Sequence, residues 1–383
     1  MRPTAPPDYP DDAVPEPVHR GRGALSNESS RYDSERRIRT TDGWESAAEP
    51  SADDELPPLR TTLTRDATRT ILARNTSPDV PFDRSINPYR GCEHGCIYCF
   101  ARPTHAYLGL SPGLDFETKL LFKPDAAKLL VGELVSPKYR PDVVAMGTNT
   151  DPYQPVEREL KITRQILRVL SDFNNPVGIV TKNHLVTRDI DILADMAKRN
   201  LAEVFVSVTT LDRALARDME PRASAPHRRL EAIRALAAAG VPAGVMTAPM
   251  IPGLNDHEME AILEAARDAG ATRAGFTVLR LPLEIKDLFQ EWLKEHRPDR
   301  AERVLSLIRQ MRGGALYQSG FGQRMKGEGP IAQLLGARFG AAVKRLGLNL
   351  VRYRLDASRF SVPESVRTAM VDAQRDSRQM RLL

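Results

Sequence analysis

All three cysteines of the chain lie within one short segment, Cys92-Glu-His-Gly-Cys96-Ile-Tyr-Cys99. This spacing places three thiolates on one tight loop, and the 383-residue chain has no fourth cysteine to complete a tetrahedral site. An iron–sulfur cube normally takes four cysteine ligands, one for each iron, so a cube held by three leaves one iron open. The spacing therefore predicts Cys92, Cys96 and Cys99 as ligands of an open iron–sulfur cluster.

Two other uses of the cysteines have to be weighed. A disulfide framework is disfavoured because the count is odd and the rest of the chain has no cysteine. Structural zinc is the main alternative, since His94 or His105 could complete a Cys3His site. Zinc ligands usually come as two separated pairs that join two segments, whereas here every sulfur lies on one loop. The residues favour the cluster and leave zinc open.

Composition indicates one large domain with extensions, because 383 residues with 41% hydrophobic content can bury a full core. We find no run of about 18 apolar residues that could span a bilayer. The segment Met1-Arg-Pro-Thr-Ala-Pro-Pro-Asp lacks the apolar stretch of a signal peptide. We therefore expect a protein without membrane contact, in a reducing cytoplasm where free thiols persist.

The two ends of the chain differ in charge. Residues 1–60 hold 8 Lys/Arg against 13 Asp/Glu and 9 of the 29 prolines, which predicts a mostly disordered extension. The segment Gly21-Arg-Gly-Ala-Leu-Ser-Asn-Glu is expected to be a local exception that docks in order. From Arg303 to the end there are 15 Lys/Arg against 5 Asp/Glu, with a basic tail at 351–383. This excess suits a polyanionic partner such as nucleic acid, or simply a solvated helical face.

The middle of the chain alternates between short apolar runs and stretches with helical period, such as 160–170 and 230–237. Strands separated by helices indicate repeated βα units around a parallel sheet. We expect an α/β fold, a partial (β/α)6 TIM-like barrel over residues 80–282, with functional loops at the C-terminal strand ends. The predicted strands lie at 84–90, 142–147, 177–181, 203–208, 241–247 and 274–279.

A helical extension is expected at 283–350, with helices near 284–296, 299–312 and 330–346 that cover the barrel's open side or form a small cap. Polar residues also follow several predicted strands, as in Gly147-Thr-Asn-Thr-Asp, Thr181-Lys-Asn-His and Ser207-Val-Thr-Thr. Any one of these groups is explained by ordinary turn chemistry. Their recurrence at the same end of one sheet indicates a common site.

The cysteine spacing, with aromatic Tyr98 just before the last cysteine, resembles the radical S-adenosylmethionine superfamily. A longer stretch of the sequence resembles the spore photoproduct lyase-related branch of this superfamily and, within that branch, an uncharacterised bacterial family. The stretch that carries this match is Asn87-Pro-Tyr-Arg-Gly-Cys-Glu-His-Gly-Cys-Ile-Tyr-Cys-Phe-Ala-Arg-Pro-Thr-His.

The resemblance implies a [4Fe-4S] cluster, S-adenosylmethionine on its open iron, and a reducing electron donor of flavodoxin or ferredoxin type. Such enzymes cleave the cofactor to methionine and a 5′-deoxyadenosyl radical, which abstracts hydrogen from a substrate. The substrate is left open, with nucleic acid as one candidate class, and no residue is assigned as catalytic. The resemblance implies these cofactor-binding residues: Tyr98, Thr150, Asp151, Lys182 and Ser207.

One departure from that branch concerns hydrogen return. In the photoproduct lyases, a further cysteine near the second-strand loop can return a hydrogen atom to the product radical. Here Gly147-Thr-Asn-Thr-Asp holds no thiol and no cysteine remains elsewhere. Two hypotheses therefore stand: a radical enzyme with a different reaction, or a zinc-stabilised nucleic-acid-binding protein without radical chemistry.

Overall fold

A computed structural model of the chain describes residues 21–34, 59–351, 353–369 and 372. Most of the predicted disordered extension at 1–60 lies outside these residues, as does the end of the basic tail. Within the part of the chain that the structure describes, no helix is long and apolar enough to cross a membrane.

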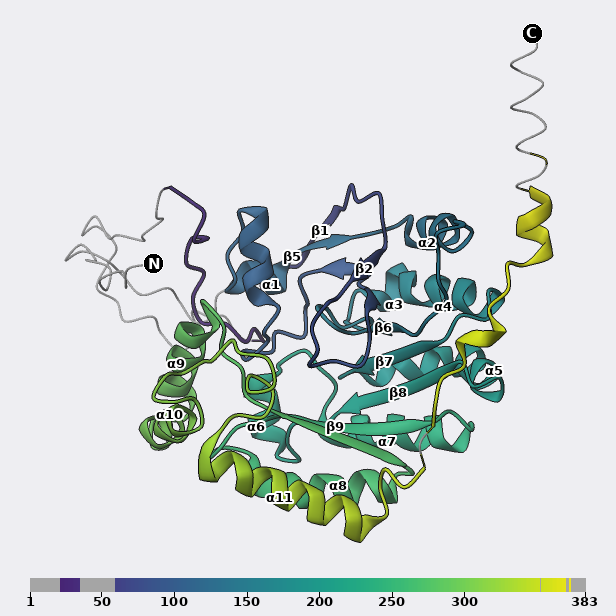
Figure 1. Cartoon of the computed structure of the whole chain (residues 1–383). Helices are drawn as coiled ribbons and strands as arrows, with labels where there is room; N and C mark the ends of the chain where they lie inside the picture. Colours follow the sequence, from purple (N-terminus) through teal and green to yellow (C-terminus); the bar gives the residue numbers. More distant parts are fainter. Residues whose placement is uncertain (1–20, 35–58, 352, 370–371, 373–383) are drawn as a thin grey trace.

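The central element is a seven-stranded sheet in the order β10-β9-β8-β7-β6-β3-β2 (Figure 1). Neighbouring strands from β3 to β10 pair in parallel, and β2 pairs antiparallel with β3 at one edge. The sheet does not close, because β2 and β10 are its two edges. The strands are β2 (Leu72–Arg74), β3 (Arg84–Ile86), β6 (Val144–Met146), β7 (Val177–Thr181), β8 (Ala202–Ser207), β9 (Ala243–Met250) and β10 (Arg273–Val278).

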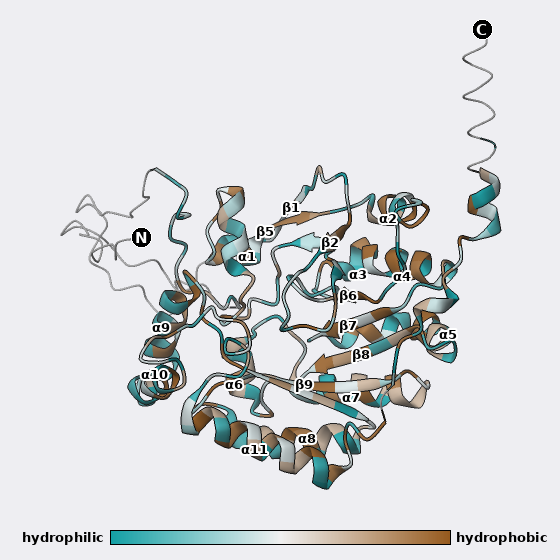
Figure 2. Ribbon diagram, in the orientation of Figure 1, coloured by the Kyte–Doolittle hydropathy of each residue, from teal (hydrophilic) through white to brown (hydrophobic). Residues whose placement is uncertain are grey.

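Helices follow the strands and bury their apolar faces against the sheet. In α4, for example, Ile162, Ile166, Leu167 and Leu170 are all buried, as their helical spacing requires. Figure 2 shows mainly hydrophobic residues along β8 and mixed faces on α8 and α11. The predicted α/β fold of repeated βα units is confirmed. The helices are α2 (Ala126–Leu134), α3 (Glu157–Leu160), α4 (Ile162–Asp172), α5 (Ile190–Lys198), α6 (Arg213–Met219), α7 (Pro226–Ala238) and α8 (Met259–Asp268).

The prediction of one continuous strand at 84–90 is wrong. Residues 84–90 form β3 in the main sheet and then β4 (Tyr89–Arg90) in a separate sheet of order β1-β5-β4. Pro88 separates the two, since proline has no N–H to donate and restricts the residue before it. The other members are β1 (Thr62–Arg65) and β5 (Lys119–Phe122), and η1 (Arg102–Leu108) and α1 (Leu114–Thr118) lie between β4 and β5 in the chain.

The C-terminal part is helical, as predicted, with α9 (Ile285–His296), α10 (Ala301–Gln310) and α11 (Gly329–Leu346). Helices α9 and α10 join an apolar cluster that includes Trp292 and, from the cysteine loop, Ile97. Helix α11 lies along α8, where Arg338 binds Glu260 at 2.6 Å. Helices α9 and α10 thus pack in one cluster with the cysteine loop, and α11 packs on α8.

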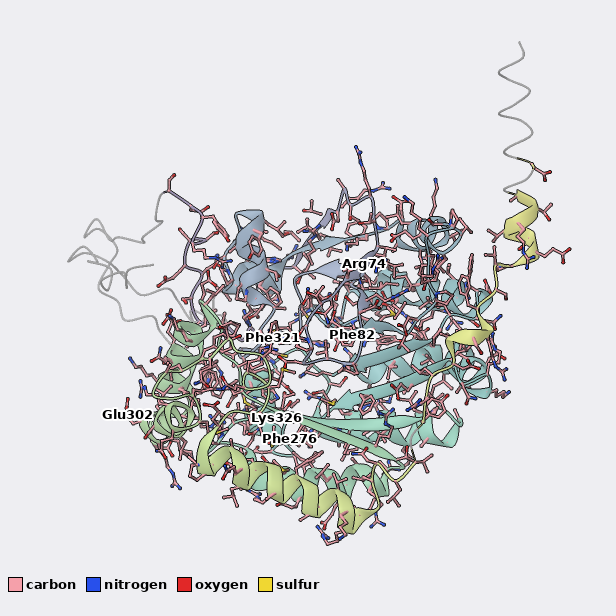
Figure 3. The ribbon with its side chains drawn as sticks, in the orientation of Figure 1. Arg74, Phe82, Phe276, Glu302, Phe321 and Lys326 are labelled. Atoms are coloured by element: carbon pink, nitrogen blue, oxygen red, sulfur yellow. The ribbon has the colours of Figure 1, made fainter. Side chains whose placement is uncertain are left out.

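The open side of the sheet is bridged by the connector between α10 and α11, residues 313–328. The backbone N–H of Val278, in β10, donates to the carbonyl oxygen of Met325 at 3.0 Å. Three residues earlier in the connector, Gly322 N–H donates to Oδ1 of Asp79 at 2.7 Å, in the loop between β2 and β3. Phe321 and Lys326 mark this stretch in Figure 3. The connector therefore links the two edges of the sheet.

Gly147 allows the turn after β6 to pass close to β7. Its φ is +89°, and a Cβ atom there would lie 1.9 Å from the carbonyl oxygen of Val180. Both the left-handed backbone and the close approach favour glycine.

We predict that Gly147→Ala lowers the free energy of unfolding by more than about 2 kcal/mol, because strain and a backbone clash add. The matched control is Gly132→Ala, at an exposed position in α2 where a Cβ meets nothing within 4 Å. The control should raise the free energy of unfolding by up to about 1 kcal/mol. Urea denaturation measures both, and equal changes in the two variants would contradict this reading of the turn.

Candidate functional site

The cysteine loop follows β4 and forms one wall of a pocket of about 250 Å³ at the C-terminal ends of the parallel strands. Cys92 and Cys96 are buried and Cys99 is partly exposed, and all three are free thiols. Burial raises the pKa of the Cys92 and Cys96 thiols, and the nearby acidic groups raise it further. A bound metal would offset this effect, because its positive charge stabilises the thiolate form of the sulfurs that ligate it.

The structure places all eight predicted site residues around this one pocket. The segment 147–151 follows β6, Lys182 follows β7, and Ser207 is the last residue of β8. Segments that are distant in sequence meet because their strands run parallel and end at the same edge. The eight are Cys92, Cys96, Tyr98, Cys99, Thr150, Asp151, Lys182 and Ser207.

Lys182 is the cation on the pocket wall formed by the β7 and β8 ends. Its Nζ donates to Oγ of Ser207 at 3.1 Å and lies 5.7 Å from the ring centroid of Tyr98. Ser207 in turn donates to the carbonyl oxygen of Ala248 at 3.1 Å. Among the described residues, no carboxylate lies within 4.0 Å of this ammonium group. The charge of Lys182 is thus available to an anionic ligand.

Asp151 is held by the protein itself. Oδ1 accepts hydrogen bonds from Tyr153 N–H at 2.8 Å and from the Thr181 hydroxyl at 2.7 Å. Oδ2 accepts from Lys182 N–H at 2.7 Å and lies 3.3 Å from Nδ1 of His94. Burial raises the pKa of Asp151, but the His94 imidazole and these hydrogen bonds outweigh it and lower the pKa. The carboxylate therefore joins the β6 and β7 loops, a role that spacing could not reveal.

Tyr98 and Thr150 are also anchored. The hydroxyl of Tyr98 donates to Glu220 and lies 3.3 Å from Oγ1 of Thr209. The hydroxyl is therefore bound by the protein, and the Tyr98 side chain lines the pocket. The Thr150 hydroxyl makes a long 3.4 Å hydrogen bond to the carbonyl oxygen of Tyr89. Both side chains are buried, which fixes their positions at the site.

A buried ion pair that sequence reasoning missed holds the cysteine loop. Arg102 and Glu117 have fully buried side chains and bind each other directly. Arg102 also donates to the carbonyl oxygens of Gly95 at 3.0 Å and Cys96 at 2.9 Å. The loop backbone is therefore fixed by a guanidinium behind it. Nothing in local spacing marks these two residues, which are fifteen positions apart and meet only in the fold.

Glu117 extends this anchor to the segment 21–34. It accepts hydrogen bonds from the backbone N–H groups of Gly23 at 3.0 Å and Ala24 at 2.9 Å. A Cβ on Gly23 would lie 1.7 Å from the carbonyl oxygen of Gly95, so the two backbones are in close contact. The predicted docking of the segment that begins at Gly21 is confirmed, and it lies directly behind the cysteine loop.

The donor set can be compared with the two metal hypotheses. Within the described ranges, no group of three or more His, Cys, Asp or Glu side chains is placed to hold a single metal ion. His94 contacts Asp151 and, through Nε2, the side-chain amide of Asn183 at 3.1 Å. His105 Nε2 contacts the carbonyl oxygen of Lys119 at 2.9 Å. Three thiols on one loop are a donor set that fits an iron–sulfur cluster, which takes one thiolate per iron.

Comparisons with known proteins agree with this geometry. A sequence model of the Radical SAM superfamily matches residues 86–266. An uncharacterised protein of Mycobacterium tuberculosis is 40% identical over 234 residues, which cover 60% of this chain and 68% of that protein. An uncharacterised protein of Methanocaldococcus jannaschii is 29% identical over 173 residues, covering 45% and 62%.

Solved structures of spore photoproduct lyase share the fold. One, complexed with dinucleoside spore photoproduct, has a TM-score of 0.55 and 16% identity, and covers 75% of this chain and 80% of its own. A variant with bound AdoMet and dinucleoside spore photoproduct has a TM-score of 0.53 and 16% identity, with the same coverage. From the superfamily match and the 40% identical relative, of which the chain covers 68%, we conclude that the chain belongs to the radical S-adenosylmethionine superfamily and is an enzyme.

Proposed function

We propose that Cys92, Cys96 and Cys99 hold a [4Fe-4S] cluster beside S-adenosylmethionine, and that the enzyme abstracts a hydrogen atom from an organic substrate. Soft thiolates are the ligands that iron–sulfur clusters take. When bound, the cluster and S-adenosylmethionine supply reductive cleavage of a carbon–sulfur bond, which yields methionine and a 5′-deoxyadenosyl radical. The protein's part is to bind, orient and shield these groups.

The observation that carries the proposal is the convergence of the cysteines with three strand ends in one pocket. The cofactor-binding residues were chosen by resemblance from the loops after β6, β7 and β8 and from the cysteine loop. If these residues only shaped the turns, their side chains would not need to line the same pocket as three thiols. Their common position supports a joint role.

Each residue then has a chemical task. The ammonium of Lys182, held by Ser207, pairs with the carboxylate of S-adenosylmethionine. The buried ring of Tyr98 offers a flat apolar surface for the adenine. Asp151 places a negative charge near the methionyl ammonium while it fixes its own loop, and Thr150 lies beside it.

The substrate and the electron donor are proposed only as classes. Spore photoproduct lyase is complexed with a dinucleoside photoproduct in the solved structures, and residues 303–383 are basic, which together support a nucleic-acid-related substrate. The chain has no thiol besides the three proposed ligands, so we do not propose photoproduct repair through a cysteine hydrogen donor. Reduction is assigned to a donor of flavodoxin or ferredoxin type.

Anaerobic purification tests the proposal. We expect about four iron and four sulfide per chain and, after reduction with dithionite and addition of S-adenosylmethionine, formation of 5′-deoxyadenosine. Cys92→Ala, Cys96→Ala and Cys99→Ala should each lower this cleavage at least about 100-fold, because a cluster iron loses its ligand. One tight zinc per chain and no cleavage would instead establish the zinc-stabilised binding protein.

Lys182→Ala should weaken S-adenosylmethionine binding roughly 10-fold to 100-fold while iron content stays unchanged, because a charged hydrogen bond is worth about 1.5–3 kcal/mol. The control is Lys198→Ala, on the exposed side of α5, which should leave both quantities unchanged. Equilibrium dialysis and iron analysis measure the two effects. Loss of iron with Lys182→Ala would show that this residue supports the cluster loop instead.

A further inference from the structure

Arg280 differs from the neighbouring buried Arg312 in having no oxygen acceptor among the residues that the structure describes. Arg312, for comparison, donates to three backbone carbonyl oxygens, those of Leu279, Gln323 and Arg324, at 2.8–3.0 Å. The hydrogen bond recorded for Arg280 joins Nη1 to Sδ of Met325 at 3.4 Å, and sulfur is a weak acceptor. Its Nε is buried with no partner among the residues that the structure describes.

The position of Arg280 directs this unsatisfied guanidinium to the pocket. Arg280 lies two residues after β10 and lines the pocket together with Phe100 and Met325. Its guanidinium carbon lies 4.8 Å from the ring centroid of Phe100. Phe100 directly follows Cys99 and remains 44% exposed. A ligand on Arg280 would therefore lie beside the cysteine loop.

The charges around Arg280 favour an anion. In the described part of the chain, no carboxylate lies within 4.0 Å of its guanidinium. Asp79 is near enough to feel its charge, but Gly322 and Arg324 already bind that carboxylate. Burial lowers the pKa of the neighbouring Arg312, and the positive charge of Arg280 lowers it further. The charge of Glu328 raises the pKa of Arg312, but no described carboxylate lies within 4.0 Å of either guanidinium group.

Arg280 is separate from the cation assigned to S-adenosylmethionine. Lys182 follows β7 and Arg280 follows β10, and β8 and β9 lie between them in the sheet. Neighbouring strands are about 4.8 Å apart, so the strand ends that carry Lys182 and Arg280 are separated by three inter-strand spacings. They therefore offer two points of attachment for two different anionic groups.

We propose that Arg280 binds an anionic oxygen group of the substrate, a phosphate or a carboxylate, in a subsite formed with Phe100 and Met325. A guanidinium over an aromatic ring can still donate from an N–H edge, and such an edge matches two oxygens of a phosphate or carboxylate. The sulfur of Met325 is a weak acceptor that an anion can replace. Arg280 is thus an anchoring residue that sets which substrates enter, and not a residue of cofactor cleavage. This inference rests on the proposed radical function.

The test is calorimetric titration of the full-length, cluster-loaded protein with S-adenosylmethionine present, so that the Lys182 site is filled. The probes are phenyl phosphate, benzoate and neutral benzamide. We expect binding of one or both anions and none of benzamide, and the stronger anion identifies phosphate or carboxylate as the natural group. Arg280→Met should weaken anion binding roughly 10-fold to 100-fold, and Arg280→Lys should restore part of it.

Arg267→Met is the control, because Arg267 is an exposed residue of α8 that does not line the pocket. It should bind the anions as the wild type does. Unchanged anion affinity in Arg280→Met, or no anion binding by the wild type, would overturn the inference. So would a matching loss of S-adenosylmethionine affinity in Arg280→Met, which would place Arg280 in the cofactor site. Failure of the proposed function is distinct, since it shows as wild-type protein without iron or cofactor cleavage.

Discussion

The buried ion pair between Arg102 and Glu117 is the constraint on which the site depends. Two opposite charges are removed from water directly behind the cysteine loop, and their desolvation is offset only because nearly every polar atom finds a partner. Arg102 fixes the carbonyl groups of Gly95 and Cys96, and Glu117 fixes the backbone of Gly23. The backbone of the cysteine loop is thus held by protein groups that lie directly behind it.

The rest of the fold brings further groups to these thiols. Parallel strands end at one edge, so the loops after β6, β7 and β8 reach the same pocket. Asp151 joins two of those loops by accepting hydrogen bonds from both sides. The connector at 313–328 then bridges the sheet's open side and places Met325 against Arg280. The residues proposed for the cofactor and the residue proposed for the substrate therefore follow different strands around one pocket.

Features that depend on neighbouring residues in the chain could be predicted from the sequence. The apolar runs predicted the parallel strands, and the spacing of Cys92, Cys96 and Cys99 marked the loop at the pocket. Prediction failed where residues meet only through the fold: Pro88 splits the first strand between two sheets, and Glu117 lies beneath a loop that it follows in the chain. Arg280 looked like an ordinary residue after a strand, because an unsatisfied Nε is visible only once its neighbours are placed.

The claim that the protein itself sets the cysteine loop is tested most directly by hydrogen exchange on Glu117→Gln, with Glu302→Gln, an outward-facing residue of α10, as control (Figure 3). Removing one partner of a buried pair costs about 3–5 kcal/mol. We predict faster exchange at residues 21–26 and 92–99 in metal-free Glu117→Gln, together with reduced iron incorporation. Exchange and iron content equal to those of the control would contradict the account.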